Sequence, residues 1–257
     1  MAEQKSRAKV LKVRTEVSLP ERYVSMSNAI ARGAQGLNLS QKRIIALAMA
    51  MTDSLPVRDL IDGGRVGWTV RLSALDYAET YEVSADTAYE QLKTSGDSLM
   101  RCLWNTVEKG KKGNIITKGP WCTLAKYYEG QGLVDITFHN YVAPHLLALR
   151  TEFTTYKLKQ AAALRSVYAW RLFECLQSWK SKGRWTPSID DFLTAMDAPE
   201  SCHKDFGNLR KRVIEPAVKE LRQKDGFLLE WESKKAGRKV IGLSFTFSKD
   251  PQGHLDL

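Results

Sequence analysis

The chain has 257 residues with 43% hydrophobic content, enough for one large or two ordinary domains that bury a core. Its net charge of +10 favours a polyanionic partner such as nucleic acid, although charge alone does not identify one. The longest apolar run, Ile44–Met51, is too short to span a membrane, and no apolar signal segment precedes it. We therefore expect a cytoplasmic protein that contacts no membrane.

Residues 1–22 are expected to form a flexible basic arm, because basic residues stand there among few apolar ones. These residues are Lys5, Arg7, Lys9, Lys12 and Arg14. A DNA-contacting arm and a merely solvated tail both fit this composition. The first clear helix is Leu39–Met51, with Ser40 as its expected cap and apolar residues at i, i+3, i+4 and i+7 counted from Ile44.

A strand, two helices and a hairpin are predicted next. The short strand Trp68–Leu72 is followed by Ser73, which with Asp76 resembles a capping box and predicts a helix over residues 74–81. Ser84 is the expected cap of a longer helix, Ala85–Leu103. The other predicted features are a loop at Pro56 and Gly63–Gly64, a hairpin over Trp104–His139 with tips at Gly110–Gly113 and Gly130–Gly132, and a closing helix at Tyr141–Leu149.

The second half of the chain repeats this order of elements, which predicts an internal duplication. Trp185 and Thr186 correspond to Trp68 and Thr69, 117 residues earlier in the sequence. The predicted elements are a helix over Tyr168–Trp179, a helix over Ile189–Met196 capped by Ser188 with Asp191, a basic helix between Asp205 and Lys224, and strands Phe227–Trp231 and Val240–Phe247 joined by the basic turn Glu232–Lys239.

A basic helix that leads into a hairpin with a basic tip is the arrangement of a winged helix. Such a module places its helix in the DNA major groove and its hairpin tip on a neighbouring backbone. We therefore predict an α+β fold with two pseudo-symmetric winged-helix domains in tandem. The predicted boundaries are residues 1–22 for the arm, 23–150 for the N-terminal winged helix, 151–250 for the C-terminal one and 251–257 for a tail, with the joint near Arg150–Arg165.

The two candidate recognition helices differ in charge. Ser84–Leu103 carries two basic and three acidic residues, a net charge of −1, whereas Lys204–Lys224 carries seven basic and three acidic residues, a net charge of +4. A negatively charged helix enters a phosphate-lined groove poorly. We therefore predict that the C-terminal domain reads most bases, while the N-terminal domain supplies backbone contacts or dimerisation. In the second helix, Pro216 is expected to mark a kink, and the expected core face holds Leu209, Val213, Ala217 and Leu221.

The predicted DNA-binding residues fall in three groups, on the second helix, on the second wing tip and on the first wing tip. Arg suits base reading because its planar fork meets guanine O6 and N7 together, whereas Lys acts as a point charge on phosphate. The residues are Lys204, Asn208, Arg210, Lys211 and Arg212; Lys234, Lys235, Arg238 and Lys239; and Lys109, Lys111 and Lys112. A solvated charged turn is the alternative for each tip taken by itself.

Several short motifs, taken in order, resemble one protein family. They are Asn28 and Leu39-Ser40-Gln41-Lys42-Arg43; Phe153-Thr154 with Leu158; Tyr168-Ala169-x-Arg171-Leu172-x-Glu174, which is the most specific; and Arg212-Val213-Ile214-x-Pro216-Ala217 with Glu220-Leu221 and Gly237-Arg238. Over roughly Tyr23–Phe247 the chain resembles the iteron-binding plasmid replication initiators of the type found on F-like plasmids.

This resemblance implies two winged helices that bind double-stranded DNA and catalyse no covalent chemistry. It implies that a monomer binds the tandem direct repeats (iterons) of a plasmid origin, helps open an AT-rich segment, and recruits the host initiator and the replicative helicase. It also implies a homodimer, formed through the N-terminal domain, that binds an inverted operator repeat and represses the protein's own gene. Such a protein takes part in plasmid copy control.

Two other functions are left open by the residues themselves. A winged-helix transcriptional repressor without an initiator role would carry the same features, and the flanking DNA would separate the two. A rolling-circle nicking enzyme needs two His separated by one residue, and none of His139, His145, His203 and His254 has that spacing. No CxxC pair or Walker loop occurs either, so we expect no enzyme, no catalytic residues, no metal and no cofactor.

Overall fold

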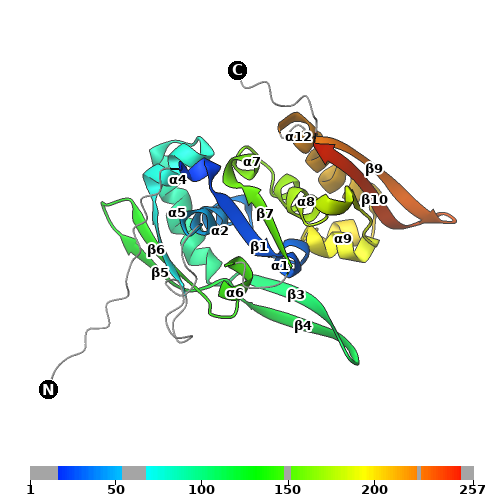
Figure 1. Cartoon of the computed structure of the whole chain (residues 1–257), viewed down its shortest axis with the longest axis horizontal. Helices are drawn as coiled ribbons and strands as arrows, with labels where there is room; N and C mark the ends of the chain where they lie inside the picture. Colours follow the sequence, from blue (N-terminus) through cyan, green and yellow to red (C-terminus); the bar gives the residue numbers. More distant parts are fainter. Residues whose placement is uncertain (1–16, 54–67, 148–151, 225–226, 250–257) are drawn as a thin grey trace.

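The computed structural model describes residues 17–53, 68–147, 152–224 and 227–249. Two units of helices and strands share one hydrophobic core, and the hairpins β5–β6 and β9–β10 project from opposite ends of the molecule (Figure 1). The predicted loop at Pro56 and Gly63–Gly64, most of the basic arm and the tail at 251–257 lie outside the described residues. In the described part, no helix is long and apolar enough to cross a membrane.

The first unit is built around a three-stranded antiparallel sheet with the strand order β2-β6-β5. Ser73 accepts hydrogen bonds from the amides of Leu75 and Asp76, which starts α4 directly after β2 as the sequence predicts. Trp68 stacks on Phe138 with ring centroids 4.5 Å apart and so joins the start of β2 to the end of β6. The elements are β2 (Thr69–Ser73), α4 (Ala74–Tyr81), α5 (Ala85–Leu99), β5 (Cys122–Tyr128) and β6 (Leu133–Phe138).

The second unit repeats this topology with the strand order β8-β10-β9. Ser188 accepts a hydrogen bond from the amide of Asp191 and starts α9. Trp185 stacks on Phe245 at 5.5 Å, as the equivalent pair does in the first unit. The predicted duplication is therefore confirmed. The elements are β8 (Arg184–Trp185), α9 (Ile189–Ala195), α10 (Glu200–His203), α11 (Phe206–Leu209), a π-helical turn η3 (Arg210–Ile214), α12 (Glu215–Lys224), β9 (Phe227–Ala236) and β10 (Lys239–Lys249).

Two segments far apart in the sequence, β1 (Tyr23–Ser27) and β7 (Phe153–Lys157), pair as an antiparallel two-stranded sheet. The helix α7 (Leu158–Ala162) follows β7 directly. The predicted joint is therefore a packed part of the fold instead of a linker. Because β7 pairs with β1, the two sides of the predicted division at residue 151 are in contact, and that division stays a prediction.

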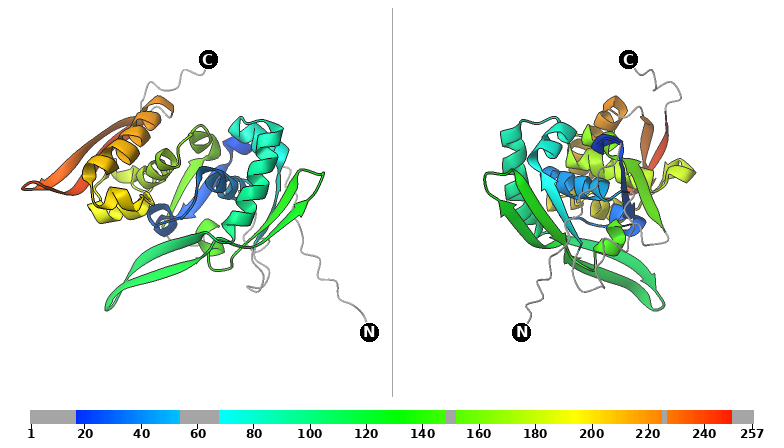
Figure 2. Two further views of the ribbon diagram at one scale, coloured as in Figure 1. Left: turned by 180° about the vertical axis from the view of Figure 1, so that it is seen from behind. Right: turned by 60° about the vertical axis from the view of Figure 1, so that its left-hand side comes forward.

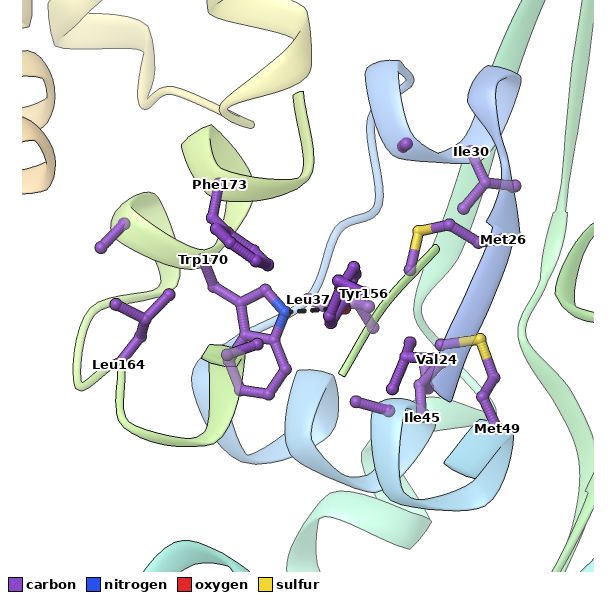
Figure 3. Close-up of a cluster of buried hydrophobic side chains, with 14 of the residues drawn as sticks. Val24, Met26, Ile30, Leu37, Ile45, Met49, Tyr156, Leu164, Trp170 and Phe173 are labelled. Atoms are coloured by element: carbon purple, nitrogen blue, oxygen red, sulfur yellow. Dashed lines mark hydrogen bonds between the residues drawn. The ribbon is translucent and has the colours of Figure 1, made fainter. Parts of the chain in front are cut away.

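Two helices, α2 (Leu39–Met51) and α8 (Val167–Gln177), form the centre of the core. Figure 3 shows side chains from α2 and β1 packed beside Tyr156 and Trp170, whose indole nitrogen donates a hydrogen bond to the Tyr156 hydroxyl at 3.1 Å. Residues 41–50 and 169–177 are all buried, a pattern typical of helices enclosed on every side. Both central helices are thus structural.

The cap of α2 differs from the prediction. Asn38, and not Ser40, accepts a hydrogen bond from the amide of Gln41, at 2.9 Å. The Gln41 side chain accepts in return from the amide of Asn38 at 2.8 Å. This reciprocal capping box starts the helix two residues earlier than a cap at Ser40 would allow.

A third hairpin, formed by β3 (Leu103–Gly110) and β4 (Gly113–Pro120), is a separate two-stranded sheet. The prediction of one hairpin over Trp104–His139 is therefore wrong, because only β5–β6 joins the sheet of the first unit. The helix α5 ends at Leu99, so Leu103, predicted to end that helix, instead starts β3 and is 52% exposed.

Two more boundaries differ from the prediction. The closing helix predicted at Tyr141–Leu149 is the short α6 (Ala143–Leu146) in the described residues. The predicted basic turn is mostly strand, and only Gly237–Arg238 turns the chain. Gly237 has a φ of +61°, which fits the first position of a type II′ hairpin turn. The remaining elements are η1 (Leu19–Glu21), α1 (Asn28–Arg32) and η2 (Lys180–Lys182).

Candidate nucleic-acid interface

The most specific family-like motif residues form a buried polar network. Glu174 of α8 pairs with Lys42 of α2 and with Arg171, whose Nη1 lies 3.0 Å away, and these side chains are at most 2% exposed. The Tyr156 hydroxyl donates to Glu174 at 2.8 Å. Burial lowers the pKa of Lys42 to about 8, against the opposing effect of Glu174. These residues hold the core together and are enclosed too deeply to reach DNA.

The same network joins the first unit to the second. Arg171 donates through Nε to the carbonyl of Ala195 in α9 at 2.9 Å and through Nη2 to the carbonyl of Gly33. Asp197, just after α9, accepts from the amide of Gln35 at 2.7 Å. Because α9 belongs to the second winged helix, these bonds help fix that unit against the segment between α1 and α2.

The candidate recognition helix of the second unit runs from Phe206 to Lys224 through α11, η3 and α12. Asp205 caps it by accepting from the amide of Gly207 at 2.7 Å. The four residues of the predicted core face are each at most 1% exposed, which confirms that face: Leu209, Val213, Ala217 and Leu221. The opposite side of the helix is left open for a partner.

Three consecutive basic residues on that open side have different surroundings. Arg210 pairs with Glu215 at 2.7 Å and lies over the ring of Trp231, 5.8 Å from its centroid. Arg212 is exposed and donates to the Ser201 hydroxyl at 3.3 Å. Lys211 is exposed, and its side chain makes no hydrogen bond or ion pair with another residue in the described part of the chain. Lys211 and Arg212 are therefore more available to DNA than Arg210.

Two further predicted residues are Lys204, just before this helix, and Asn208, in its first turn. Lys204 is exposed and pairs with Glu200 at 3.3 Å, where both side chains are at least 80% exposed. An ion pair this open to solvent is weak, so the ammonium group is free to move to a phosphate. Asn208 is only partly exposed. Contact of these residues with DNA stays a prediction.

The four basic residues of the second wing, Lys234, Lys235, Arg238 and Lys239, are all exposed. They lie at or beside the turn of the β9–β10 hairpin, and the end of this hairpin projects from the molecule (Figure 2). Successive residues of a strand point to opposite faces. On β9, Lys234 therefore shares its face with the exposed Glu230 and Glu232, whereas Lys235 lies on the opposite face. Of these two lysines, Lys235 has the better electrostatic setting for a phosphate contact.

The first unit offers a more acidic surface. The exposed residues of α5 include Asp86, Glu90 and Asp97 beside Lys93. The true wing of this unit is β5–β6, whose tip carries Glu129 and no cation. Because this tip has no cation, it attracts a phosphate backbone less than a basic tip would.

The wing of the first unit is held tightly to its helix. The Tyr127 hydroxyl donates to the carbonyl of Lys93 at 2.8 Å. A Cβ added at Gly96 would lie 2.4 Å from the same hydroxyl, so the close approach of β5 to α5 requires glycine there. These contacts join the wing of the first unit to α5.

The lysines predicted for the first wing lie elsewhere. Lys111 and Lys112 are exposed at the turn of β3–β4, and the backbone of Lys109 pairs with Asn114 in the same hairpin. Their assignment to the wing of the first unit is wrong, because β3–β4 shares no sheet with β2. This hairpin extends toward the same end of the molecule as β9–β10 (Figures 1 and 2).

The comparisons with known proteins agree with this geometry. Residues 23–177 match the family described as Initiator Replication protein, WH1, and residues 188–247 match Initiator Rep protein, WH2. The chain belongs to the initiator replication protein family. The predicted resemblance and the predicted tandem winged-helix fold are both confirmed.

Three relatives illustrate the breadth of the similarity. The chain is 26% identical over 228 residues to an uncharacterized 27.6 kDa protein of Escherichia coli, which covers 86% of this chain and 93% of that protein. It is 30% identical over 108 residues to a probable replication protein rep of Bifidobacterium longum (strain NCC 2705), with 42% and 36% covered. A crystal structure of Pi initiator protein in complex with iteron DNA superposes with a TM-score of 0.69 at 21% identity, covering 90% of this chain and 99% of that chain.

The histidines and carboxylates show no catalytic arrangement in the described residues. His145 is buried and shares a 2.7 Å hydrogen bond with Ser27, and His203 bonds to the carbonyl of Ala198 at 3.0 Å. Within the described ranges, no group of three or more His, Cys, Asp or Glu residues could hold a metal ion. The absence of catalytic residues, cofactor and metal stays an expectation from the sequence.

Proposed function

We propose that this protein is a plasmid replication initiator that binds the directly repeated sites of its origin as a monomer. The observation that carries the proposal is a recognition helix of net charge +4 with Lys211 and Arg212 on its open side, followed by a hairpin with a basic tip. Membership of the initiator family and the fold shared with an iteron-bound initiator support the same function.

The second winged helix reads the bases in this proposal. The major groove admits an α-helix and shows each base pair a distinct pattern of donors and acceptors. Arg212 is suited to a bidentate contact with guanine, while Lys235, Arg238 and Lys239 neutralise phosphates of the neighbouring backbone. The first winged helix and the β3–β4 tip contribute contacts that carry no sequence information.

Footprinting the protein on the origin of its own plasmid tests this proposal. We expect protection of tandem direct repeats beside an AT-rich tract. If about six to ten phosphates are contacted, affinity falls by about 10³–10⁵-fold between 50 and 200 mM salt. Protection of a lone inverted repeat would instead favour a repressor without an initiator role, and a flat salt dependence would contradict the proposed interface.

We propose that the protein also forms a homodimer through the first unit and that the dimer represses its own gene. The support comes from β3–β4, where Val107 and Ile116 face each other across the strands and are 49% and 60% exposed. A two-stranded hairpin with exposed apolar side chains gains stability by covering them.

The dimer proposal is tested by Ile116→Lys, with the neighbouring exposed Thr117→Lys as the control for added charge. We expect Ile116→Lys to shift the protein to monomers in sedimentation, to abolish binding to an inverted operator repeat and to keep iteron binding. If the dimer persists in Ile116→Lys, or is lost equally in Thr117→Lys, the apolar face of β3–β4 is not the dimer interface.

We further propose that the bound monomers help open the origin and recruit the host initiator and the replicative helicase. The family membership supports this step. Permanganate reactivity of the AT-rich tract in a supercoiled origin plasmid should rise when the protein is added together with the host initiator. Unchanged reactivity would limit the protein to DNA binding, and relaxation of the plasmid with Mg²⁺ and protein alone would point to nicking.

A further inference from the structure

The recognition helix of the second unit is interrupted by the π-helical turn η3, which ends at Ile214, two residues before Pro216. In this turn the amide of Glu215 donates to the carbonyl of Arg210, five residues earlier, where an α-helix would use a spacing of four. Such turns are rare and occur often at functional sites.

Proline explains why the helix widens at this point. Pro216 has no amide hydrogen, and its ring would clash with the carbonyl of Arg212 in a regular α-helix. A π-helical turn holds more residues than the about 3.6 of an α-turn and so relieves this conflict without ending the helix.

The same turn aligns the core face. Leu209, Val213, Ala217 and Leu221 repeat every four residues, and in a regular α-helix such a row drifts around the axis. Each of these residues is nevertheless at most 1% exposed. The wider turn offsets this drift, so the buried row stays in contact with the core. Relative to a regular α-helix, the residues before Pro216 are therefore rotated about the helix axis.

The rotation has a consequence for Arg210. Side chains five residues apart do not face each other on an α-helix. Here Arg210 Nε lies 2.7 Å from Glu215 Oε1, and the guanidinium lies over Trp231 of β9. Arg210 thus connects the helix to the wing strand, whereas Lys211 and Arg212 are left on the open side.

We propose that Pro216 is a positioning residue for DNA recognition: by holding the π turn it makes Arg210 a structural link to the wing and presents Lys211 and Arg212 to the bases. This inference rests on the proposed function and names which basic residues perform it. It differs from the prediction that Arg210, Lys211 and Arg212 all bind DNA.

The first test replaces Pro216 by Ala, which restores the amide donor and permits a continuous α-helix. The matched control is Gln223→Ala, an exposed position on the same helix. We expect Pro216→Ala to keep its affinity for random duplex, which shows that the domain still folds, but to lose about tenfold or more in affinity for the iteron, the loss expected when a base contact is misplaced. An iteron affinity equal to that of the control would overturn the inference.

A second test does not depend on how Pro216→Ala folds. Arg210→Ala, Glu215→Ala and the double variant are compared by the ratio of iteron to random-duplex affinity. If Arg210 is a link, all three variants lower this ratio by the same factor. If Arg210 reads DNA, Arg210→Ala lowers the ratio while Glu215→Ala leaves or raises it, and the inference is wrong. A wild-type protein with no iteron preference would refute the proposed function itself.

Discussion

The two winged helices share a topology but differ in the surface that each offers to DNA. Both have a helix start capped by serine after the first strand and a tryptophan stacked on a phenylalanine of the last strand. The exposed side of α5 is acidic on balance, whereas the helix in residues 206–224 is basic. The core thus preserves the fold in both copies, while the exposed residues decide which copy can enter a DNA groove.

The two units also connect helix to wing in different ways. In the first, Gly96 lets Tyr127 approach α5, and the contact is a neutral hydrogen bond to a backbone carbonyl. In the second, Arg210 reaches from the π turn to Trp231 of β9. The contact in the first unit involves no basic side chain, whereas the contact in the second unit uses Arg210, one of the residues predicted to bind DNA.

The largest expected effect is a loss of stability when the buried network shared by the two units is broken. Glu174→Ala leaves Lys42 and Arg171 buried without their counter-charge, so we expect a loss of about 3–5 kcal/mol in the free energy of unfolding, measured by urea titration. The control is Glu200→Ala, whose partner Lys204 is exposed, and it should change the stability little. Equal small losses in both would show that the buried network does not hold the units together.

The second-largest expected effect is a loss of iteron affinity, which tests whether the second unit reads most of the bases. Arg212→Ala or Lys211→Ala should weaken iteron binding by about 1–3 kcal/mol and relax sequence preference, because a bidentate base contact is worth that much. Lys93→Ala on α5 is the matched change in the other unit and should have a smaller effect that is equal for all sequences. Binding is measured by titration of fluorescent duplexes. A larger loss of preference in Lys93→Ala would reverse the assignment.

The third effect concerns the β3–β4 tip. Replacing Lys111 and Lys112 by Ala should weaken iteron and random duplex alike and reduce the slope of log affinity against log salt by about one for each phosphate that the protein no longer neutralises. Measurement at several salt concentrations gives the slope. If these variants alter sequence preference as Arg212→Ala does, the proposed division of labour is wrong.

The smallest effect separates neighbouring residues of the second wing. Lys235→Ala should reduce the salt slope by about one, whereas Lys234→Ala should change it less, because Lys234 shares its strand face with Glu230 and Glu232. The two variants have the same net charge and are measured under the same conditions. A larger change in Lys234→Ala would indicate that the opposite face of β9 meets the DNA.

Much of the fold could be predicted because local rules decide helix starts and buried faces. Ser73, Ser84 and Ser188 cap the helices that the sequence assigns to them. The strand pairings could not be predicted in the same way. The residues of β3–β4 and β5–β6 are consecutive in the chain, and only the pairing of β6 with the distant β2 separates a wing from an added hairpin.

The candidate site was predicted in outline but not in detail. The sequence located the basic helix and hairpin, because charge and apolar spacing are visible in the residues themselves. It gave no sign that Arg210 pairs with Glu215, since a spacing of five is not a contact in a regular helix. The family-like residues Lys42, Arg171 and Glu174 likewise proved to be buried structural groups.

The duplication, the core faces and the contrast in charge between the two recognition helices could be inferred from the amino-acid sequence, because these features depend on residue type and local spacing. The tertiary structure alone decided which hairpin is the wing of the first unit, how β7 joins β1, and which basic residues remain open to DNA. The physical reason is that these features depend on partners far away in the chain, whose hydrogen bonds and charges meet only after folding.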